Sequence, residues 1–194
     1  MKLYMIRHGE SCANRDGLFS LPTVPLTENG IRDAESVGRM LKGHAFDRVL
    51  VSPYLRAQQT QQYAMPGVEA EIVDDLHECD CGRLEGHPMD EMRARYEHLS
   101  EDMRREDYTS YGGEDYENMR RRVRSLMDYV LSLECETVVA FSHCGLILTF
   151  FDEIMDRPGK IGRNINCRNG SINVFEYRNG KWRVDAMNIT EHPL

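Results

Sequence analysis

Arginine and histidine side chains follow three apolar runs of the sequence. Arg7 and His8 come directly after KLYMI, Arg56 lies soon after DRVLVS, and His143 follows TVVAFS. A guanidinium presents a fixed fork of donors that matches phosphate oxygens. An imidazole with an ordinary pKa near ~6.5 is either a neutral nucleophile or a charged stabiliser, according to its neighbours. The set predicts a phosphate site in which one histidine attacks phosphorus and the other holds the transferring group.

The segments that carry these residues alternate between strand and helix patterns. Apolar runs predict strands at 2–6, 47–52, 69–73 and 137–142, and a hairpin over 171–187 that turns at Asn179-Gly180. Helical spacing of apolar residues or helix-start signals predict helices over 26–43, 52–65, 114–133 and 143–155. Thr27 and Ser52 are expected as N-caps, with Pro53 in the first turn of its helix and Gly43 as a stop.

This order of elements predicts an α/β fold. We expect a three-layer α/β/α sandwich with a mostly parallel central sheet and a C-terminal antiparallel hairpin. Ligands of such folds bind outside the carboxyl ends of the strands. The three strand ends that carry arginine and histidine are therefore expected to converge.

Several motifs along the chain resemble those of the histidine phosphatase superfamily, which includes the cofactor-dependent phosphoglycerate mutases. The matching blocks are, in order, RHGESCAN, PLTENG, SPYLRAQQT, LHECDCGRLEG, GGE at 112–114 and SHCG. Two positions depart from the family pattern: Cys144 replaces the commoner glycine after the second histidine, and Asp115 replaces the serine of G-G-E-S. Neither departure removes a catalytic group.

The resemblance implies a two-step reaction without a metal ion. His8 would attack the phosphoryl group to form phosphohistidine, which water would then hydrolyse. Arg7, Arg56 and His143 would hold the non-bridging oxygens and stabilise the transition state.

Two further site residues follow from the same resemblance. Glu78 would protonate the leaving oxygen and then accept a proton from water, although Asp74, Asp75 and Asp80 lie close to it in the sequence. Asn14 would contact the phosphate or, alternatively, only cap a turn. Of the other histidines, His77 alone is assigned a place, at the pocket edge.

The chain is expected to be a single phosphoglycerate mutase-like domain over 1–194, with residues 86–113 as a lid or insertion over the active site. Residues 90–117 contain ten acids against four arginines, a net charge of −6. Such a cover should admit water, which favours hydrolysis over phosphoryl transfer back to an intermediate. Four of its residues are expected to set substrate preference: Arg93, Arg95, Tyr96 and Tyr111.

Composition and charge argue against a nucleic-acid-binding protein and against a membrane-spanning one. A net charge of −8 disfavours nucleic acid as a partner, and the most apolar stretch is too short to span a bilayer. The six cysteines, without a recognisable leader, favour reduced thiols and a cytoplasmic location. No metal site and no cofactor are expected, and a homodimer is left open. Cys12 and Cys144 lie beside the catalytic histidines, where a lowered pKa would make a thiol reactive; inert packing is the alternative.

The sequence therefore predicts a metal-independent phosphatase that hydrolyses small phosphate monoesters through a phosphohistidine. The alternatives are a cofactor-dependent phosphoglycerate mutase, an α-ribazole phosphatase and, least favoured, an inactive phosphate-binding protein. All five residues of the expected machinery are present, which argues against the inactive alternative.

Overall fold

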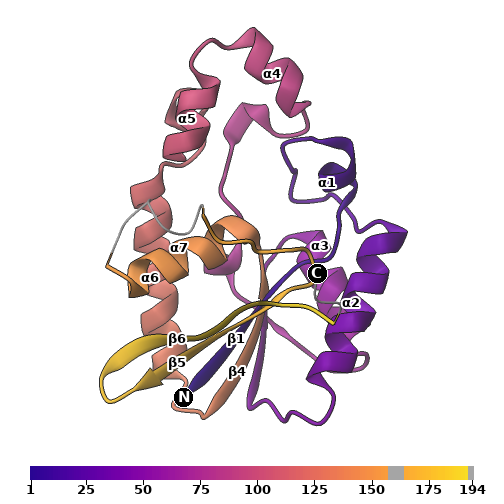
Figure 1. Ribbon diagram of the computed structural model, residues 1–194, viewed down its shortest axis with the longest axis vertical. Helices are drawn as coiled ribbons and strands as arrows, with labels where there is room; N and C mark the ends of the chain where they lie inside the picture. The colour runs from indigo at the N-terminus through magenta and orange to yellow at the C-terminus, as the bar shows by residue number, and fades with distance from the viewer. Residues whose placement is uncertain (157–163, 192–194) are drawn as a thin grey trace.

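The protein is built around a six-stranded sheet with the order β3-β2-β4-β1-β5-β6. The computed structural model describes residues 1–156 and 164–191. The strands are β1 (Lys2–Arg7), β2 (Arg48–Val51), β3 (Glu71–Ile72), β4 (Thr137–Ser142), β5 (Ile172–Arg178) and β6 (Lys181–Ile189). The first four strands are parallel to one another, and β5 and β6 form an antiparallel hairpin at one edge (Figure 1).

The hairpin turns where the sequence predicts it. Asn179 and Gly180 both have positive φ angles, 54° and 76°. A two-residue turn of this kind matches the twist of the flanking strands, and asparagine and glycine are the residues that adopt it most readily. The turn therefore fixes the register of β5 against β6.

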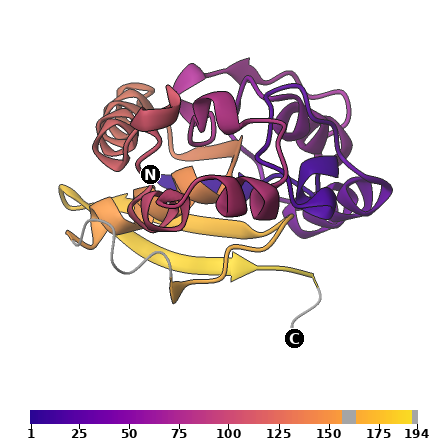
Figure 2. The ribbon, with the colours of Figure 1, turned by 90° about the horizontal axis from the view of Figure 1, so that it is seen from above.

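Helices cover both faces of the sheet, as Figure 2 shows from above. They are α2 (Glu28–Leu41), α3 (Leu55–Ala64), α6 (Tyr116–Ser132) and α7 (Cys144–Ile154). Alternate residues of β4 belong to two cores: Val138 and Ala140 pack with α6 and α7, whereas Val139 and Phe141 pack with α2 and α3. The alternation arises because successive strand side chains point to opposite faces. The three-layer α/β/α architecture predicted from the sequence is confirmed.

A smaller group of elements lies beyond the carboxyl ends of the parallel strands (Figure 1). It contains α1 (Cys12–Asp16), α4 (Met89–Arg95), α5 (Leu99–Arg105) and three short 3-10 helices, η1 (Asp74–Leu76), η2 (Gly82–Leu84) and η3 (Thr109–Tyr111). Four of these elements, α4, α5, η2 and η3, share a small apolar cluster around Phe19, Leu84, Leu99 and Tyr108, whereas Leu76 of η1 packs in the main core. The group stands over the edge of the sheet at which a ligand is expected.

The start of α2 follows its predicted N-cap, whereas the start of α3 does not. Thr27 caps α2 as predicted, and its hydroxyl accepts a hydrogen bond from the Gly30 N–H at 3.0 Å. The helix expected from Ser52 begins instead at Leu55, with Tyr54 at the cap. Ser52 does not cap because its hydroxyl bonds to His143. Proline at position 53 therefore precedes the helix and does not lie in its first turn.

Asp115 has a structural role that fits its departure from the family pattern. It caps α6, and its Oδ1 accepts a hydrogen bond from the Asn118 N–H at 2.6 Å. Aspartate and serine are both good N-cap residues. The replacement of serine by aspartate therefore leaves this helix start intact.

Glycine is required where α2 meets the turn that carries the first histidine. A Cβ atom on Gly9 would lie 2.2 Å from the Gly30 carbonyl oxygen, and one on Gly30 would lie 2.0 Å from the Glu10 carbonyl oxygen. Both contacts are with backbone atoms, which cannot easily move aside. The two glycines let the helix press directly against the chain next to His8.

Candidate active site

Three adjacent parallel strands end at one cavity. In the sheet β4 lies between β1 and β2, and Ser142 pairs with Arg7 while Phe141 pairs with Val51. The residues that follow these strands are therefore level with one another. A cavity of about 240 Å³ opens there, and Arg7, His8 and Arg56 are among its lining residues.

His8 is buried and oriented as a neutral nucleophile. Its Nδ1 lies 2.7 Å from the Gly9 carbonyl oxygen. A carbonyl only accepts hydrogen bonds, so Nδ1 carries the proton and Nε2 carries the lone pair. Burial, together with the charges of Arg56 and Arg7, holds the pKa of His8 well below its ordinary value. The imidazole is thus uncharged at neutral pH.

Arg56 is the largest fully buried side chain of the described chain and contacts His8 directly. Its Nε donates to His8 Nε2 at 3.2 Å, and its Nη1 donates to the Leu21 carbonyl at 3.1 Å. The guanidinium also stacks on the Tyr54 ring, 5.0 Å from the centroid. The lone pair of His8 Nε2 accepts the hydrogen bond from Arg56 Nε, so this hydrogen bond must break before His8 can attack phosphorus.

His143 lies beside His8, with the two ring centroids 5.1 Å apart. Its Nε2 is 2.8 Å from Ser52 Oγ, which also accepts a hydrogen bond from the Tyr54 N–H. Burial, and then Arg56, lowers the pKa of His143 well below its ordinary value. Because Ser52 Oγ already accepts the hydrogen bond from Tyr54, we assign its proton to the bond with His143 Nε2, which places the proton of the neutral ring on Nδ1.

Two buried nitrogen atoms of the site have no hydrogen-bond partner within the described residues. They are His143 Nδ1 and Arg7 Nε. The Arg7 guanidinium is anchored at its other end, where Nη1 donates to the Cys167 carbonyl. Buried polar groups normally have partners, so two open donors next to a buried nucleophile indicate a site for an anion.

Among the neighbouring acidic residues of its motif, Glu78 is the one that the structure brings to the cavity. It lines the cavity, whereas Asp74, Asp75 and Asp80 do not. Its Oε1 accepts from the Cys79 N–H at 3.0 Å and its Oε2 accepts from the Gly145 N–H at 3.3 Å. A Cβ atom on Gly145 would lie 2.5 Å from Glu78 Oε1, so glycine at this position makes room for the carboxylate.

Asn14 also lines the cavity, close to the first histidine. Its Oδ1 accepts hydrogen bonds from the Ser11 backbone and hydroxyl and from Asn169 Nδ2. Asn14 thus belongs to the capping box of α1, and its amide nitrogen is the group that can donate to an anion. Both roles considered for this residue are compatible. His77 stacks on Tyr54, with centroids 5.9 Å apart, and His192 lies outside the described residues.

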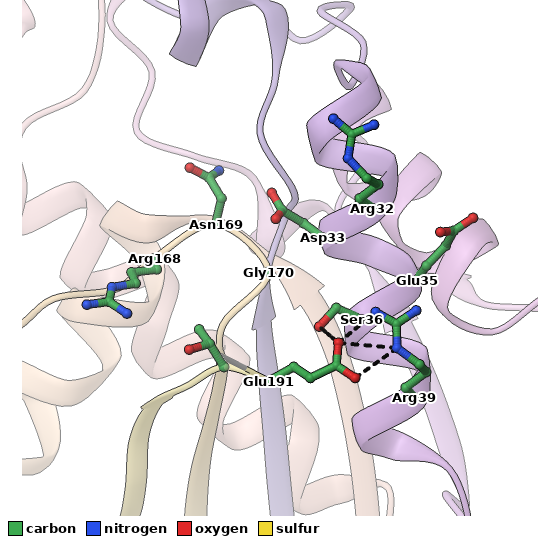
Figure 3. A pocket seen from close by; sticks show the side chains of 10 residues that line it. Arg32, Asp33, Glu35, Ser36, Arg39, Arg168, Asn169, Gly170 and Glu191 are labelled. Carbon is green, nitrogen blue, oxygen red and sulfur yellow. Dashed lines mark hydrogen bonds and ion pairs between the residues drawn. The ribbon is translucent and has the colours of Figure 1, made fainter. Parts of the chain in front are cut away.

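Asn169 was not identified from the sequence, although it holds the back of the site. Its Nδ2 donates to the His8 carbonyl at 3.1 Å, and the neighbouring Gly170 N–H points to the carbonyls of Arg7 and His8. Asn169 and Gly170 also line a second cleft of about 590 Å³ between α2 and the end of β6, in which Glu191 bonds Ser36 and Arg39 (Figure 3). This cleft therefore lies behind the backbone of His8.

The cover over the cavity differs from the expectation. Residues 86–113 contribute Met89, Met103, Glu106 and Tyr108 to the cavity wall. The four residues expected to set substrate preference are not in this wall. They interact within the cover: Arg93 bonds Asp90, Arg95 lies over Tyr96, and the Tyr96 and Tyr111 rings pack edge to face. Amphipathic spacing alone did not reveal which face of these short helices meets the cavity.

The structure separates the two interpretations of the cysteine beside the second histidine. A hydrogen bond to Cys167, together with burial, raises the pKa of the Cys144 thiol, and the same hydrogen bond lowers the pKa of Cys167. A reactive thiol with a lowered pKa at Cys144 is therefore not supported, whereas inert packing fits this position. Cys12 does not line the cavity, whereas Cys79 and Cys81 do.

Metal clusters and membrane-spanning helices are both absent from the described residues. No three or more histidine, cysteine, aspartate or glutamate side chains among them are grouped as they would be to hold a metal ion. None of the helices they form has the length and apolar character needed to cross a membrane.

The fold and site define a class of protein that the comparisons identify. The model of the histidine phosphatase superfamily (branch 1) matches residues 3–190. The adenosylcobalamin/alpha-ribazole phosphatase of Salmonella typhimurium is 31% identical over 173 residues, which is 81% of each chain. The "Probable phosphoglycerate mutase GpmB" of Yersinia pestis is 26% identical and covers 94% of this chain and 87% of its own. The chain belongs to the histidine phosphatase superfamily.

Solved structures agree with this assignment. A phosphoserine phosphatase from Entamoeba histolytica superposes with a TM-score of 0.83 at 27% identity and covers 100% of this chain and 99% of its own. The α-ribazole phosphatase from Shigella flexneri has the same fold, with a TM-score of 0.88 at 23% identity over 97% of this chain and 96% of its own. These relatives are phosphatases, which fits a phosphoric monoester hydrolase.

The Ser52–His143 hydrogen bond leads to the first prediction. Ser52→Ala removes the donor that keeps the proton of His143 on Nδ1, so kcat should fall by on the order of tenfold to a hundredfold with a smaller change in KM. Steady-state kinetics with p-nitrophenyl phosphate measure both constants. Ser36→Ala, which removes a hydroxyl from the second cleft, is the matched control. An unchanged kcat in Ser52→Ala would show that the hydroxyl does not orient His143.

The lowered pKa of His8 leads to the second prediction. Below about pH 6.5 the unfolded chain binds a proton at this position and the folded chain does not, so acid lowers the free energy of unfolding. This loss of stability is absent above that pH and grows to about 1.4 kcal/mol at pH 5.5 for one histidine. Urea unfolding of the wild type and of His8→Gln at pH 7.5 and 5.5 isolates it. Between pH 7.5 and pH 5.5, the free energy of unfolding of the wild type should fall by that amount more than that of His8→Gln. A difference that is independent of pH would contradict the buried, neutral state of His8.

Proposed function

We propose that His8 is the nucleophile of a phosphatase that hydrolyses small phosphate monoesters. The observation that carries the proposal is the state of this residue: a neutral, buried imidazole whose Nε2 lone pair faces buried donors. Arg7 Nε, Arg56 and His143 Nδ1 supply positive charge or hydrogen-bond donors around it. These groups suit a phosphoryl group, which carries oxygens on every side of phosphorus.

The first step transfers the phosphoryl group to the protein. His8 Nε2 forms a bond to phosphorus while the bond from phosphorus to the ester oxygen breaks. Glu78, in its protonated form, gives its proton to the leaving oxygen, which departs as an alcohol. Arg56 exchanges its hydrogen bond to His8 for one to a phosphoryl oxygen, while Arg7 and His143 bind the others.

The second step restores the protein. Water attacks phosphorus, the bond to His8 Nε2 breaks, and the Glu78 carboxylate accepts the proton of the water. Phosphate leaves and His8 regains its lone pair. The Gly9 carbonyl keeps the proton on Nδ1 throughout, so the ring needs no reorientation between the steps.

We also propose that the chain acts as a single domain in which residues 86–113 serve as the lid. Within the described part of the chain, this lid contributes no arginine or lysine to the cavity. A mutase needs extra cationic groups to retain a doubly anionic intermediate. The lining therefore favours hydrolysis. Phosphoglycerate mutase activity is the second candidate, because one relative of this chain is named a probable phosphoglycerate mutase. The α-ribazole phosphatases among the relatives make α-ribazole phosphate a substrate to test. A cytoplasmic location and a small-molecule substrate complete the proposal.

Trapping the intermediate tests the nucleophile directly. Brief reaction with a ³²P-labelled phosphate ester, followed by an alkaline quench, should leave label on the wild-type protein, because phosphohistidine survives alkali. His8→Ala should trap none, whereas His87→Ala, which alters an exposed histidine, should trap the wild-type amount. Equal labelling of His8→Ala would rule out His8 as the nucleophile.

A single assay separates the two candidate functions. The protein is given 3-phosphoglycerate with catalytic 2,3-bisphosphoglycerate, and both free phosphate and 2-phosphoglycerate are followed. We expect phosphate release to exceed isomerisation, because nothing in the described wall would hold the second anion. Fast isomerisation with little phosphate release would instead establish the mutase.

A further inference from the structure

The cavity has two ends of different chemistry. Arg7, His8 and Arg56 line the phosphate end, and they include the only cationic side chains that the described residues place in the lining. The rest of the wall is largely apolar or aromatic and includes Leu18, Phe19, Met89, Met103, Tyr108 and Met119. A phosphate ester bound at the cationic end would extend its leaving group along this wall.

The apolar wall is fixed in place by the elements behind it. Phe19 and Tyr108 are 3% and 7% exposed and pack edge to face, with ring centroids 6.4 Å apart. The Met89 N–H donates to the Gly17 carbonyl at 2.9 Å, and the Phe19 N–H donates to the His87 carbonyl at 3.0 Å. The loop after α1 and the start of α4 are thus tied together. The wall is largely formed before a ligand enters, which lowers the ordering cost of binding.

The methionines of this wall suit leaving groups of varied shape. Met89 and Met103 are half-buried, with their side chains between the small apolar cluster and the cavity. Methionine is flexible and polarisable, and it contacts alkyl chains and aromatic rings about equally well. Removing apolar surface of a ligand from water against such side chains is favourable.

A second anionic group on the substrate would be disfavoured at the same place. The charged residues in the remainder of the described lining are acidic, Glu78 and Glu106. Two arginines of the cover do not line the cavity: Arg105 pairs with Glu101, and Arg93 pairs with Asp90 and also donates from Nε to the Met103 sulfur at 3.4 Å. An anion seated against the methionines would lose water and would meet no cation among the described residues of this part of the lining.

We propose that this wall is a leaving-group subsite for the uncharged, apolar part of a phosphate monoester, either an alkyl chain or an aromatic ring. The inference rests on the proposed function, since it names the substrate class of the same cavity. It separates apolar monoesters from sugar phosphates and from esters that carry a carboxylate or a second phosphate.

A series of n-alkyl phosphates tests the subsite. Ethyl, butyl and hexyl phosphate have primary alcohols of similar intrinsic reactivity as leaving groups, so differences in kcat/KM report contacts with the leaving group. We expect kcat/KM to rise with chain length by up to about fourfold for each methylene that becomes buried. The six-carbon phosphate with a terminal carboxylate should be at least about tenfold poorer than hexyl phosphate.

A charge placed in the wall should reverse this preference. Met89→Lys should lower kcat/KM for hexyl phosphate about tenfold and raise it for the carboxylate analogue. Met40→Lys makes the same change on α2, away from the cavity, and should leave both values as in the wild type.

The outcomes separate the subsite from the proposed function. If the wild type hydrolyses all the esters with no dependence on chain length, or prefers the carboxylate analogue, the subsite is wrong while the phosphatase stands. If no ester is hydrolysed and no label reaches His8, the proposed function itself fails. The wild-type series decides the matter even if Met89→Lys does not fold.

Discussion

The contact between Arg56 and His8 in the protein interior is the interaction on which the rest of the site depends. Burying a guanidinium without water is costly, and the cost must be offset by partners. The protein supplies the Leu21 carbonyl and the face of Tyr54, and burial still lowers the pKa of Arg56. Within the described residues the buried Arg56 guanidinium still lacks an anionic hydrogen-bond partner, and a phosphate ester would supply one. Burial, followed by the charge of Arg56, keeps His8 neutral and therefore nucleophilic.

The fold holds this contact by connecting the site to its most rigid parts. Arg7 and His8 continue a central strand, His143 continues its neighbour, and Arg56 lies on a helix that packs against the sheet. Gly9 and Gly30 bring α2 against the backbone beside His8, while Asn169 holds its carbonyl from the other side. Such a cluster of buried polar groups costs stability in the free protein, which is common where a site is built for a ligand.

The sequence predicted those parts of the site whose signals are local. Arginine and histidine directly after apolar runs indicated the strand ends, and parallel pairing of neighbouring strands brought them together. The layered fold followed from the alternation of strand and helix patterns. Glu78 was chosen over its acidic neighbours through the resemblance to the family, and in the structure it lines the cavity whereas Asp74, Asp75 and Asp80 do not.

The features that the sequence did not predict depend on distant partners. The Ser52 hydroxyl could cap a helix or bond a histidine 91 residues away, and the second use prevailed. The sequence left a reactive thiol or inert packing open for Cys144, because Cys167, its hydrogen-bond partner, lies far along the chain. Tyr96 and Tyr111 pack on each other and do not line the cavity, and the sequence alone does not show which side of these short segments meets it.

The central claim is that the buried cations and the open donors Arg7 Nε and His143 Nδ1 form one phosphate site around His8 Nε2. A crystal structure of the protein with orthovanadate, which imitates a phosphoryl group in transfer, tests this claim most directly. The account predicts vanadium bonded to His8 Nε2, with its oxygens at Arg7 Nε, the Arg56 guanidinium and His143 Nδ1, and with the Arg56–His8 hydrogen bond broken. Vanadate bound elsewhere, or bound in the cavity with Arg56 still donating to His8 Nε2, would contradict it.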